Sequence, residues 1–281
     1  RHSFPTRRSS DLRLAFSRRH RTIIYLGDAH FACTWIGALL ARLLRKRVFF
    51  WTHGYTRRDT GVKAIVRRAF YSIPDGLLLY GHRGRALAIE AGIPEGHLHV
   101  IHNSLDFENQ QALLKELSTC DLAGIRQTFF PGQLAPIVLV CSRLTKRKRI
   151  DLAIHAVGLL KRQGHMVNIL VVGEGSERQY LEALASNEAV PCRFVGALYT
   201  ERDLARCFLA CAVVVSPGDV GLTAIHAMGY GRPVISHDCL DDQMPEVEAV
   251  VEGLTGLLYK YNDTTSLSKA IFAATQTLRP S

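Results

Sequence analysis

From residue 22 onward, short runs rich in Val, Ile and Leu alternate with segments of helical periodicity. Typical strand-like runs are TIIYLG (22–27), RVFFWTH (47–53) and VNILVVG (167–173), and a typical helical segment covers 150–163. Strands separated by helices of this length form βαβ units, and such units build parallel sheets. The sequence therefore predicts an α/β fold.

The alternation is interrupted between 107 and 136, where FFPGQLAP (129–136) is typical of a linker. Two alternating stretches on either side of a break predict two Rossmann-like domains, which we place at 13–132 and 133–281. Ligands of such sheets bind outside the carboxyl ends of the strands. Functional residues are therefore expected in the strand-to-helix loops.

The composition is typical of a soluble globular protein, with 47% hydrophobic and 21% charged residues among 281. No apolar run is long enough to cross a bilayer. The seven cysteines are scattered, and the closest pair, Cys207 and Cys211, has no matching Cys or His pair. This pattern indicates reduced cysteines rather than a zinc site or a disulfide framework.

The stretch HSFPTRRSSDL (2–12) matches the translation of a widely used sequencing adapter. The alternative is a natural basic, Ser-rich leader, but eleven consecutive matches favour the adapter. We therefore interpret 1–12 as an artefact, exclude it from fold reasoning and expect the natural sequence to begin near Arg13.

The positive charge is concentrated early in the chain. Residues 13–80 hold 13 Lys and Arg against 3 Asp and Glu, whereas residues 81–281 hold 19 against 21. Such a basic region favours an anionic partner, either a membrane surface or a phosphate-bearing substrate. A solvated basic face with no partner is the alternative. No nucleic-acid-binding motif is present, so nucleic acid is not expected as a partner.

Three later segments carry chemistry. In VCSRLTKRKRIDLAIHA (140–156), Arg143 follows a strand and Lys148 precedes a helix. Fixed cations at this position suit a diphosphate, whose negative charge grows as a glycosyl bond breaks. A solvated basic loop is the alternative interpretation.

In VVGEGSERQYL (171–181), Gly173 and Gly175 allow close backbone approach, and Ser176 is the expected N-cap of the next helix. An ordinary capped turn would look the same.

The third segment, SPGDVGLTAIHAMGYGRPVIS (216–236), places Gly221 before a helix expected over about 222–230. Amides at a helix start bind anions, and a glycine lets a phosphate come near. Asp219 and His226 are seven residues apart, so both can lie on one face of the helix if Asp219 is near its N-cap.

In this order and spacing, the three segments resemble the C-terminal half of a GT-B glycosyltransferase of family 4. The family pattern is Gly-Arg-Leu-(three)-Lys, Gly-x-Gly, Phe-x-Gly, and a glutamate followed after seven residues by a second in LEAMA-x-G-x-PV. The resemblance extends over roughly 20–275 and includes EAVVEGLTGLLY (248–259). The matching residues are Ser142-Arg143-Leu144 with Lys148, Gly173-Glu174-Gly175, Phe194-Val195-Gly196, and Ala227-Met228 with Gly231, Pro233 and Val234.

The resemblance implies two Rossmann-like domains with parallel sheets facing a cleft. It implies that Arg143 and Lys148 bind the donor diphosphate. The amides around Gly221, Leu222 and Thr223 would help to hold the phosphates. The 194–198 loop, with Gly196, Ala197 and Leu198, would lie against the base. No cofactor or metal is expected, and the chain has no Asp-x-Asp motif.

Two positions depart from the family pattern. The second glutamate, which holds the ribose, falls on His226, and the first, which meets the donor sugar, falls on Gly218 with Asp219 next to it. A neutral histidine can still bind a ribose hydroxyl, and Asp219 could serve if the turn shifts by one residue. The alternative is a structural histidine in a fold that no longer catalyses.

In the first half, His53 lies at a strand end in FWTHGYTRRD (50–59). It is our candidate for the family histidine that faces the donor sugar, with Arg57 and Arg58 placed to meet an anionic acceptor. Asn103 belongs to VIHNSLDFE, which resembles the I-x-N-G-V-D element that closes the first domain, and it is expected to shape that turn.

The leading hypothesis is a glycosyltransferase that moves a sugar from a UDP- or GDP-sugar to a saccharide or lipid-linked saccharide, with retention implied by the resemblance. It would work in surface polysaccharide synthesis, in the cytosol or at the inner face of the plasma membrane. The alternatives are a nucleotide-sugar 2-epimerase of the same fold and a non-catalytic nucleotide-sugar-binding module.

The resemblance also implies that the first domain is incomplete, because its opening strand and Gly-rich loop should precede residue 20. A C-terminal helix that crosses back to that domain is likewise expected beyond Ser281. We expect the chain as written to be inactive and poorly stable in its first domain, because central strands would lose their neighbours.

Overall fold

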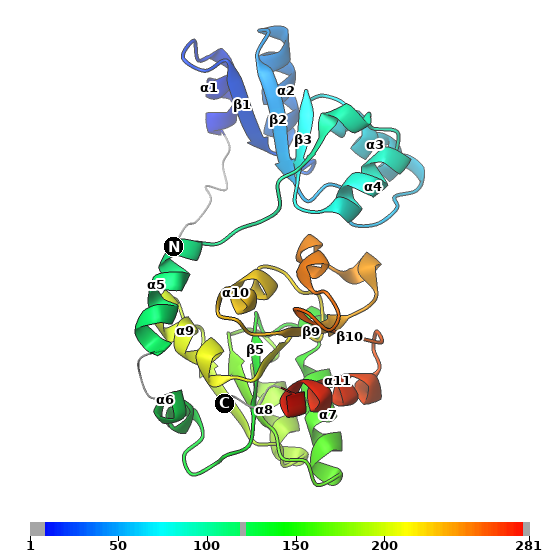
Figure 1. The fold of residues 1–281 in the computed structure, drawn as a ribbon. Coiled ribbons are helices and arrows are strands. Elements are labelled where there is room, and N and C mark those ends of the chain that lie inside the picture. The colour runs from blue at the N-terminus through cyan, green and yellow to red at the C-terminus, as the bar shows by residue number, and fades with distance from the viewer. Residues whose placement is uncertain (1–8, 119–121, 278–281) are drawn as a thin grey trace. The chain divides into compact units, whose positions relative to one another are not determined.

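The computed structural model describes residues 9–118 and 122–277, which form two compact units divided between Asn103 and Ser104 (Figure 1). Residues 1–8 of the predicted artefact lie outside the described residues, and Ser9–Leu12 begin the first helix. None of the described helices is long and apolar enough to cross a membrane.

The first unit is a parallel four-stranded sheet in the order β1-β2-β3-β4. Its elements are α1 (Ser9–Phe16), β1 (Thr22–Leu26), α2 (Ala32–Leu43), β2 (Arg47–Thr52), α3 (Gly61–Tyr71), β3 (Gly76–Leu79), α4 (His82–Glu90), the 3-10 turn η1 (Glu95–His97) and β4 (Leu98–Val100). Phe50 and Phe70 stack at the centre of its core, with ring centroids 4.6 Å apart.

The second unit is a parallel six-stranded sheet in the order β10-β9-β8-β5-β6-β7. Its helices are α5 (Phe107–Ser118), α6 (Leu122–Phe129), α7 (Ile150–Arg162), α8 (Arg178–Asn187), α9 (Glu201–Ala210), α10 (Thr223–Gly229) and α11 (Thr264–Thr277). Its strands are β5 (Ile137–Cys141), β6 (Asn168–Val172), β7 (Cys192–Gly196), β8 (Val213–Val215), β9 (Val234–His237) and β10 (Gly256–Tyr259). The 3-10 turns are η2 (Lys146–Lys148), η3 (Leu240–Asp242) and η4 (Pro245–Ala249).

Strand β5 shows why the second sheet is covered on both faces. Its side chains alternate between two separate cores, with Val138 and Val140 in one and Ile137 and Leu139 in the other. The first core receives side chains from α7, α8 and α11, and the second from α5, α6, α9 and α10. The sequence of a strand buried on both faces is an uninterrupted apolar run, and IVLVC is such a run. The predicted α/β fold with parallel sheets is confirmed.

Two helices occupy the segment whose pattern loosens in the sequence. Both α5 and α6 pack against α9, and Leu117, Ile125 and Phe130 are buried in the second unit's core. Because these apolar side chains are buried there, the described residues between 104 and 132 belong with the second unit. The division of the structure therefore falls earlier than the limit we predicted at 132.

Candidate functional site

Three loops of the second unit meet at the carboxyl edge of its sheet. They follow β5, β6 and β8, and β5 pairs with both of the other strands. The amide of Leu144 donates to the carbonyl of Glu174 at 3.0 Å, and the amide of Gly218 donates to the carbonyl of Lys148 at 3.0 Å. The β5 loop is thus hydrogen-bonded to both neighbouring loops. All three segments that carry chemistry in the sequence lie at one edge.

The glycines of these loops have two different physical roles. A Cβ atom at Gly173, Gly175 or Gly218 would overlap the carbonyl oxygen of Ser142, Leu144 or Arg147, respectively. The space that these glycines leave open is therefore filled by the protein's own backbone.

Gly221 differs from the other three, because a Cβ atom there would meet no atom within 4 Å. Among these four glycines, it is the one that leaves room for a ligand beside its backbone.

Asp219 forms ion pairs with two cations of the loop that follows β5. Its Oδ1 is 3.1 Å from Lys148 Nζ, and its Oδ2 is 3.1 Å from Arg147. Lys148 Nζ also donates to the Asp219 carbonyl at 2.8 Å. The Asp219 side chain is only 7% exposed, against 23% for Lys148. The structure therefore brings together Lys148 and Asp219, and the carboxylate and carbonyl fix the position of the ammonium group.

Helix α10 spans Thr223–Gly229, close to the range expected from the sequence, and its N-cap residue is Leu222. Asp219 is therefore not near the N-cap, so the condition for sharing a helix face with His226 is not met. The N-cap expected at Ser176 is wrong. Helix α8 begins at Arg178, its N-cap residue is Glu177, and no side chain caps it. In both places the backbone of the loop is hydrogen-bonded to another loop or side chain. The amide of Glu177 donates to the Leu144 carbonyl, and that of Val220 to Gln243.

Gln243 anchors the loop after β8 and was missed by sequence reasoning. Its Oε1 accepts from the Val220 amide at 2.8 Å, and its Nε2 donates to Ser236 Oγ at 2.8 Å and to the His237 carbonyl at 2.9 Å. Ser236 Oγ in turn donates to the Ser216 carbonyl at 3.1 Å. All these groups are buried, so the loop that carries Asp219 is rigidly held. No local motif marks Gln243, because its partners are distant in sequence.

His226 points to a carboxylate of the neighbouring helix α9. Its Nε2 lies 2.7 Å from Glu201 Oε1, the same oxygen that accepts from the Tyr230 hydroxyl at 2.7 Å and from Gln110 Nε2 at 3.4 Å. The ring centroids of His226 and Phe208 are 4.5 Å apart. An ionised carboxylate can only accept, so His226 donates through Nε2 and its Nδ1 stays available to another group.

The same cluster sets the ionisation of its members. Burial raises the pKa of Glu201, but the hydrogen bonds from Tyr230 and His226 outweigh that effect and lower the pKa below its usual value. Burial and the hydrogen bond to Glu201 raise the pKa of the Tyr230 hydroxyl. Glu201 is thus held ionised and Tyr230 neutral, the states in which Tyr230 donates and Glu201 accepts.

We predict that Tyr230→Phe weakens the acid sensitivity of the second unit. Because the folded pKa of Glu201 is lowered, the cluster stabilises the protein above the unfolded pKa of about 4.3. That stabilisation is lost as the pH falls through the folded pKa. Removing the Tyr230 hydroxyl brings the two pKa values closer together. The loss of unfolding free energy between pH 7 and pH 3.5, measured by urea titration, should be smaller than in the unmodified chain.

Tyr199→Phe is the matched control, since Tyr199 is 92% exposed. An equal change in both variants would contradict the assignment of this acid sensitivity to Glu201.

The remaining predicted donor-side residues also belong to this edge. Thr223 Oγ1 donates to the Cys141 carbonyl at 2.9 Å, which places the start of α10 over the end of β5. The Gly173 amide donates to the Gly196 carbonyl at 2.8 Å. Ala197 and Leu198 follow and are half-buried, and Leu222 is exposed.

Arg143 is exposed and takes part in no ion pair among the described residues. The ligands of these residues stay predictions.

In the first unit, His53 follows β2 and is exposed, with its ring centroid 4.7 Å from that of Tyr80 after β3. Arg58 pairs with Glu90 at 2.9 Å, and Arg57 is exposed. Asn103 is the last residue of the unit. His53 and the two arginines thus lie at or beyond the carboxyl end of β2. Their roles, and that of Asn103, stay predictions.

Within residues 9–118 and 122–277, no group of three His, Cys, Asp or Glu side chains is placed to hold a metal ion.

The comparisons with known proteins agree on one family. The family model described as glycosyl transferases group 1 matches residues 135–276. The chain is 27% identical over 252 residues to the glycogen synthase of Yersinia pseudotuberculosis, covering 81% of the chain and 50% of that enzyme. It is 28% identical over 149 residues to the amylovoran biosynthesis glycosyltransferase AmsK of Erwinia amylovora, covering 50% of the chain and 36% of AmsK. The chain thus spans half or less of the length of these curated relatives.

The fold has solved counterparts. The Anabaena protein HepE, in complex with UDP, matches with a TM-score of 0.73 at 17% identity, covering 95% of this chain and 74% of HepE. With two parallel α/β units, the fold is GT-B. Because the family model covers half of the chain and its range includes all three loops of the second unit, the chain belongs to the glycosyl transferases of group 1.

Proposed function

We propose that this protein transfers a sugar from a UDP- or GDP-sugar to a hydroxyl of a saccharide or lipid-linked saccharide. One observation carries the proposal: the loop after β5 holds Arg143 and Lys148 at the carboxyl edge of the second sheet, where α10 begins. The glycine before α10, Gly221, is the one with open space beside it. Cations beside an open helix start form an arrangement that suits a nucleotide diphosphate. The UDP bound to HepE supports the same class of donor.

The chemistry assigned to these residues is electrostatic. The bond between the sugar's anomeric carbon and the diphosphate oxygen breaks while a bond to the acceptor oxygen forms. The acceptor's proton passes to the departing diphosphate. Arg143 and Lys148 stabilise the negative charge that grows on that diphosphate, so no nucleophile from the protein is required. Retention of the anomeric configuration is what the family resemblance implies.

Asp219 acts in this scheme as a positioning residue for Lys148. Its carboxylate is nearly buried and lies within 3.1 Å of both Lys148 and Arg147. Anchoring the ammonium group before the donor binds avoids reorganisation during the reaction. The sequence suggested instead that Asp219 meets the donor sugar. The ion pairs are the reason we favour the positioning role.

His226→Ala is expected to weaken UDP binding about fivefold to tenfold, the amount typical of one lost hydrogen bond. The ring donates to Glu201 through Nε2, which leaves Nδ1 to accept from a ribose hydroxyl. Tyr230→Phe is the control, because it removes a neighbouring bond to Glu201 and keeps the imidazole. Isothermal titration with UDP measures both. Unchanged affinity in His226→Ala would show that the histidine is only structural.

We propose that the acceptor is a surface polysaccharide or its lipid-linked precursor, and that the transfer takes place at the inner face of the plasma membrane. The net charge of +10 over residues 13–80 favours an anionic surface or acceptor. The amylovoran biosynthesis role in the name of AmsK supports a polysaccharide product.

The decisive experiment incubates the purified protein, expressed from the natural gene, with UDP-glucose, UDP-galactose or GDP-mannose, with and without a saccharide acceptor. We expect release of UDP or GDP and extension of the acceptor only when both substrates are present. Consumption of the donor without an acceptor would indicate an epimerase. Donor binding without turnover, unchanged by Lys148→Ala, would indicate a binding module.

A further inference from the structure

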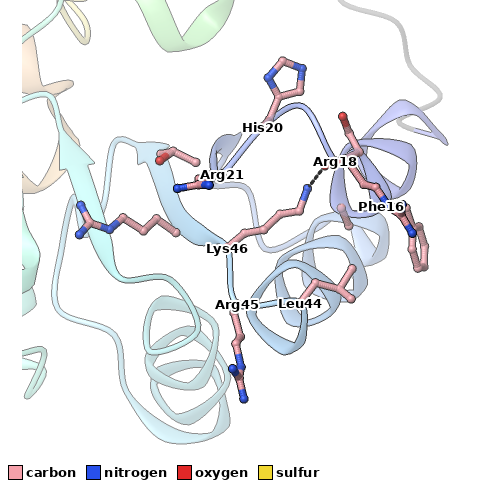
Figure 2. A pocket seen from close by; sticks show the side chains of 11 residues that line it. Phe16, Arg18, His20, Arg21, Leu44, Arg45 and Lys46 are labelled. Carbon is pink, nitrogen blue, oxygen red and sulfur yellow. Dashed lines mark hydrogen bonds between the residues drawn. The ribbon is translucent and has the colours of Figure 1, made fainter.

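A cavity of about 940 Å³ in the first unit is lined by basic and apolar side chains (Figure 2). It lies between the end of α1, the start of β1 and the turn from α2 to β2. Six basic side chains line it, namely Arg18, His20, Arg21, Arg45, Lys46 and Arg47.

Little carboxylate charge lies close to these basic side chains, since Asp75 is within electrostatic range of Arg47 but is paired with Arg42. None of the residues that line the cavity is Asp or Glu. Among the described residues, no ion pair joins Arg18, Arg21, Arg45 or Arg47 to an acid. Lys46 is the one cation with a structural use, since its Nζ donates to the carbonyls of Leu14 and Ser17. Like charges gathered in this way repel one another, and an anion in the cavity would relieve that repulsion.

The position of the cavity separates it from the substrate edge of the same sheet. Strands β1 and β2 are parallel, and Thr22 pairs with Arg47 at their amino ends. The cations therefore lie at the amino edge, whereas parallel sheets bind substrates at the carboxyl edge. His53 and Arg57 lie at or beyond that carboxyl edge. We therefore expect the cavity to bind an anionic partner other than the sugar donor or acceptor.

Large apolar side chains surround the cations. Phe16 is 63% exposed, Leu43 79% and Leu44 49%. Phe16 and Leu44 line the cavity itself, and both are labelled in Figure 2. A purely ionic ligand such as inorganic phosphate has no use for exposed leucine and phenylalanine. A membrane interface can bind both kinds of side chain. Apolar side chains enter the boundary of the acyl chains, and cations contact the anionic headgroups.

We propose that this amino-edge surface, formed by Phe16, Arg18, Arg21, Leu43, Leu44 and Arg45, docks on a bilayer that contains anionic phospholipids. The phosphodiester headgroups occupy the cationic cavity, and the apolar side chains insert beside them. The inference rests on the proposed function for its membrane setting, and it names the surface that makes the contact.

The test is sedimentation of the full chain with vesicles, in the absence of donor and acceptor. One set of vesicles is pure phosphatidylcholine, and the other is an equal mixture of phosphatidylcholine and phosphatidylglycerol. We expect binding to the mixed vesicles only. Arg18→Glu with Arg21→Glu should lower the partition coefficient at least about thirtyfold, since each basic side chain near an anionic surface contributes about 1 kcal/mol and the surface repels the new carboxylates.

Lys260→Glu with Lys269→Glu is the matched control, because both lysines are exposed in the second unit and the charge change is the same. Equal loss in the two double variants would overturn the proposal, since only net charge would then matter. Thermal unfolding checks that each variant is folded.

Leu43→Gln distinguishes binding to a bilayer from binding to other anionic ligands. We expect it to lower the vesicle partition coefficient about fivefold, because less apolar surface enters the bilayer. Binding to single-stranded DNA or to inorganic phosphate should not respond to this change. If Leu43→Gln left the vesicle partition coefficient unaltered and the chain bound DNA tightly, the partner would be nucleic acid and not a bilayer. Equal binding to both kinds of vesicle would also refute the proposal. Transfer to a soluble saccharide, assayed separately, shows whether the proposed function itself fails.

Discussion

Replacing Arg143 with alanine is expected to lower the turnover number for sugar transfer by about 10²–10³-fold and to leave the unfolding temperature unchanged. The size of the effect is that of removing one fixed charge-stabilising donor from an active site. Stability should not change because Arg143 is exposed and belongs to no ion pair among the described residues. Initial rates with saturating UDP-sugar and acceptor, together with a thermal melt, measure the two quantities.

Lys146→Ala provides the control for this prediction. Lys146 is an equally exposed cation on the same loop and is not one of the residues assigned to the diphosphate. Similar losses in the two variants would show that the loop acts only through its total charge, which would refute a specific role for Arg143. Lys148→Ala is a less clean probe, because it leaves the buried Asp219 carboxylate with Arg147 as its sole ion-pair partner among the described residues.

The second large effect concerns stability. Gly175→Ala is expected to destabilise the second unit by at least about 3 kcal/mol, at the upper end of what overpacking costs. The new methyl group would overlap the carbonyl, carbonyl carbon and amide of Leu144, which are backbone atoms that cannot rotate away. The hydrogen bond from Leu144 to the Glu174 carbonyl would also be strained.

The two tryptophans allow the two units to be followed separately. Trp35 and Trp51, the only ones in the chain, both belong to the first unit. Tryptophan fluorescence therefore reports the first unit, while far-ultraviolet circular dichroism reports both units. In urea titrations of Gly175→Ala, the dichroism transition of the second unit should move to lower urea, and the fluorescence transition should stay in place.

Gly221→Ala is the contrasting variant. Its methyl group would meet no atom within 4 Å, so we expect unfolding to be unchanged and UDP affinity to fall. If Gly221→Ala were as destabilising as Gly175→Ala, the distinction between backbone packing and ligand access would not hold.

Much of the fold could be predicted from local pattern. The strand IVLVC is apolar at every position because it faces two cores, and it begins after Pro136 and ends before the polar residues Ser142 and Arg143. The positions of the loops with Gly173, Gly175 and Gly218 also follow from the sequence, because each glycine comes after an apolar run. The reason for the three glycines could not be predicted, since each one packs against a carbonyl of another loop.

Residue type and periodicity predict the α/β alternation, the parallel sheets and the loops in which cations and glycines gather, because both act locally. How those residues are used depends on the tertiary structure. It joined Lys148 to Asp219, and His226 to Glu201, across 71 and 25 positions of the chain. It also gathered Arg21 and Arg45 at one edge of the first sheet. Ion pairs and hydrogen bonds between distant residues depend on how the strands and helices are arranged in space, so no local pattern records them.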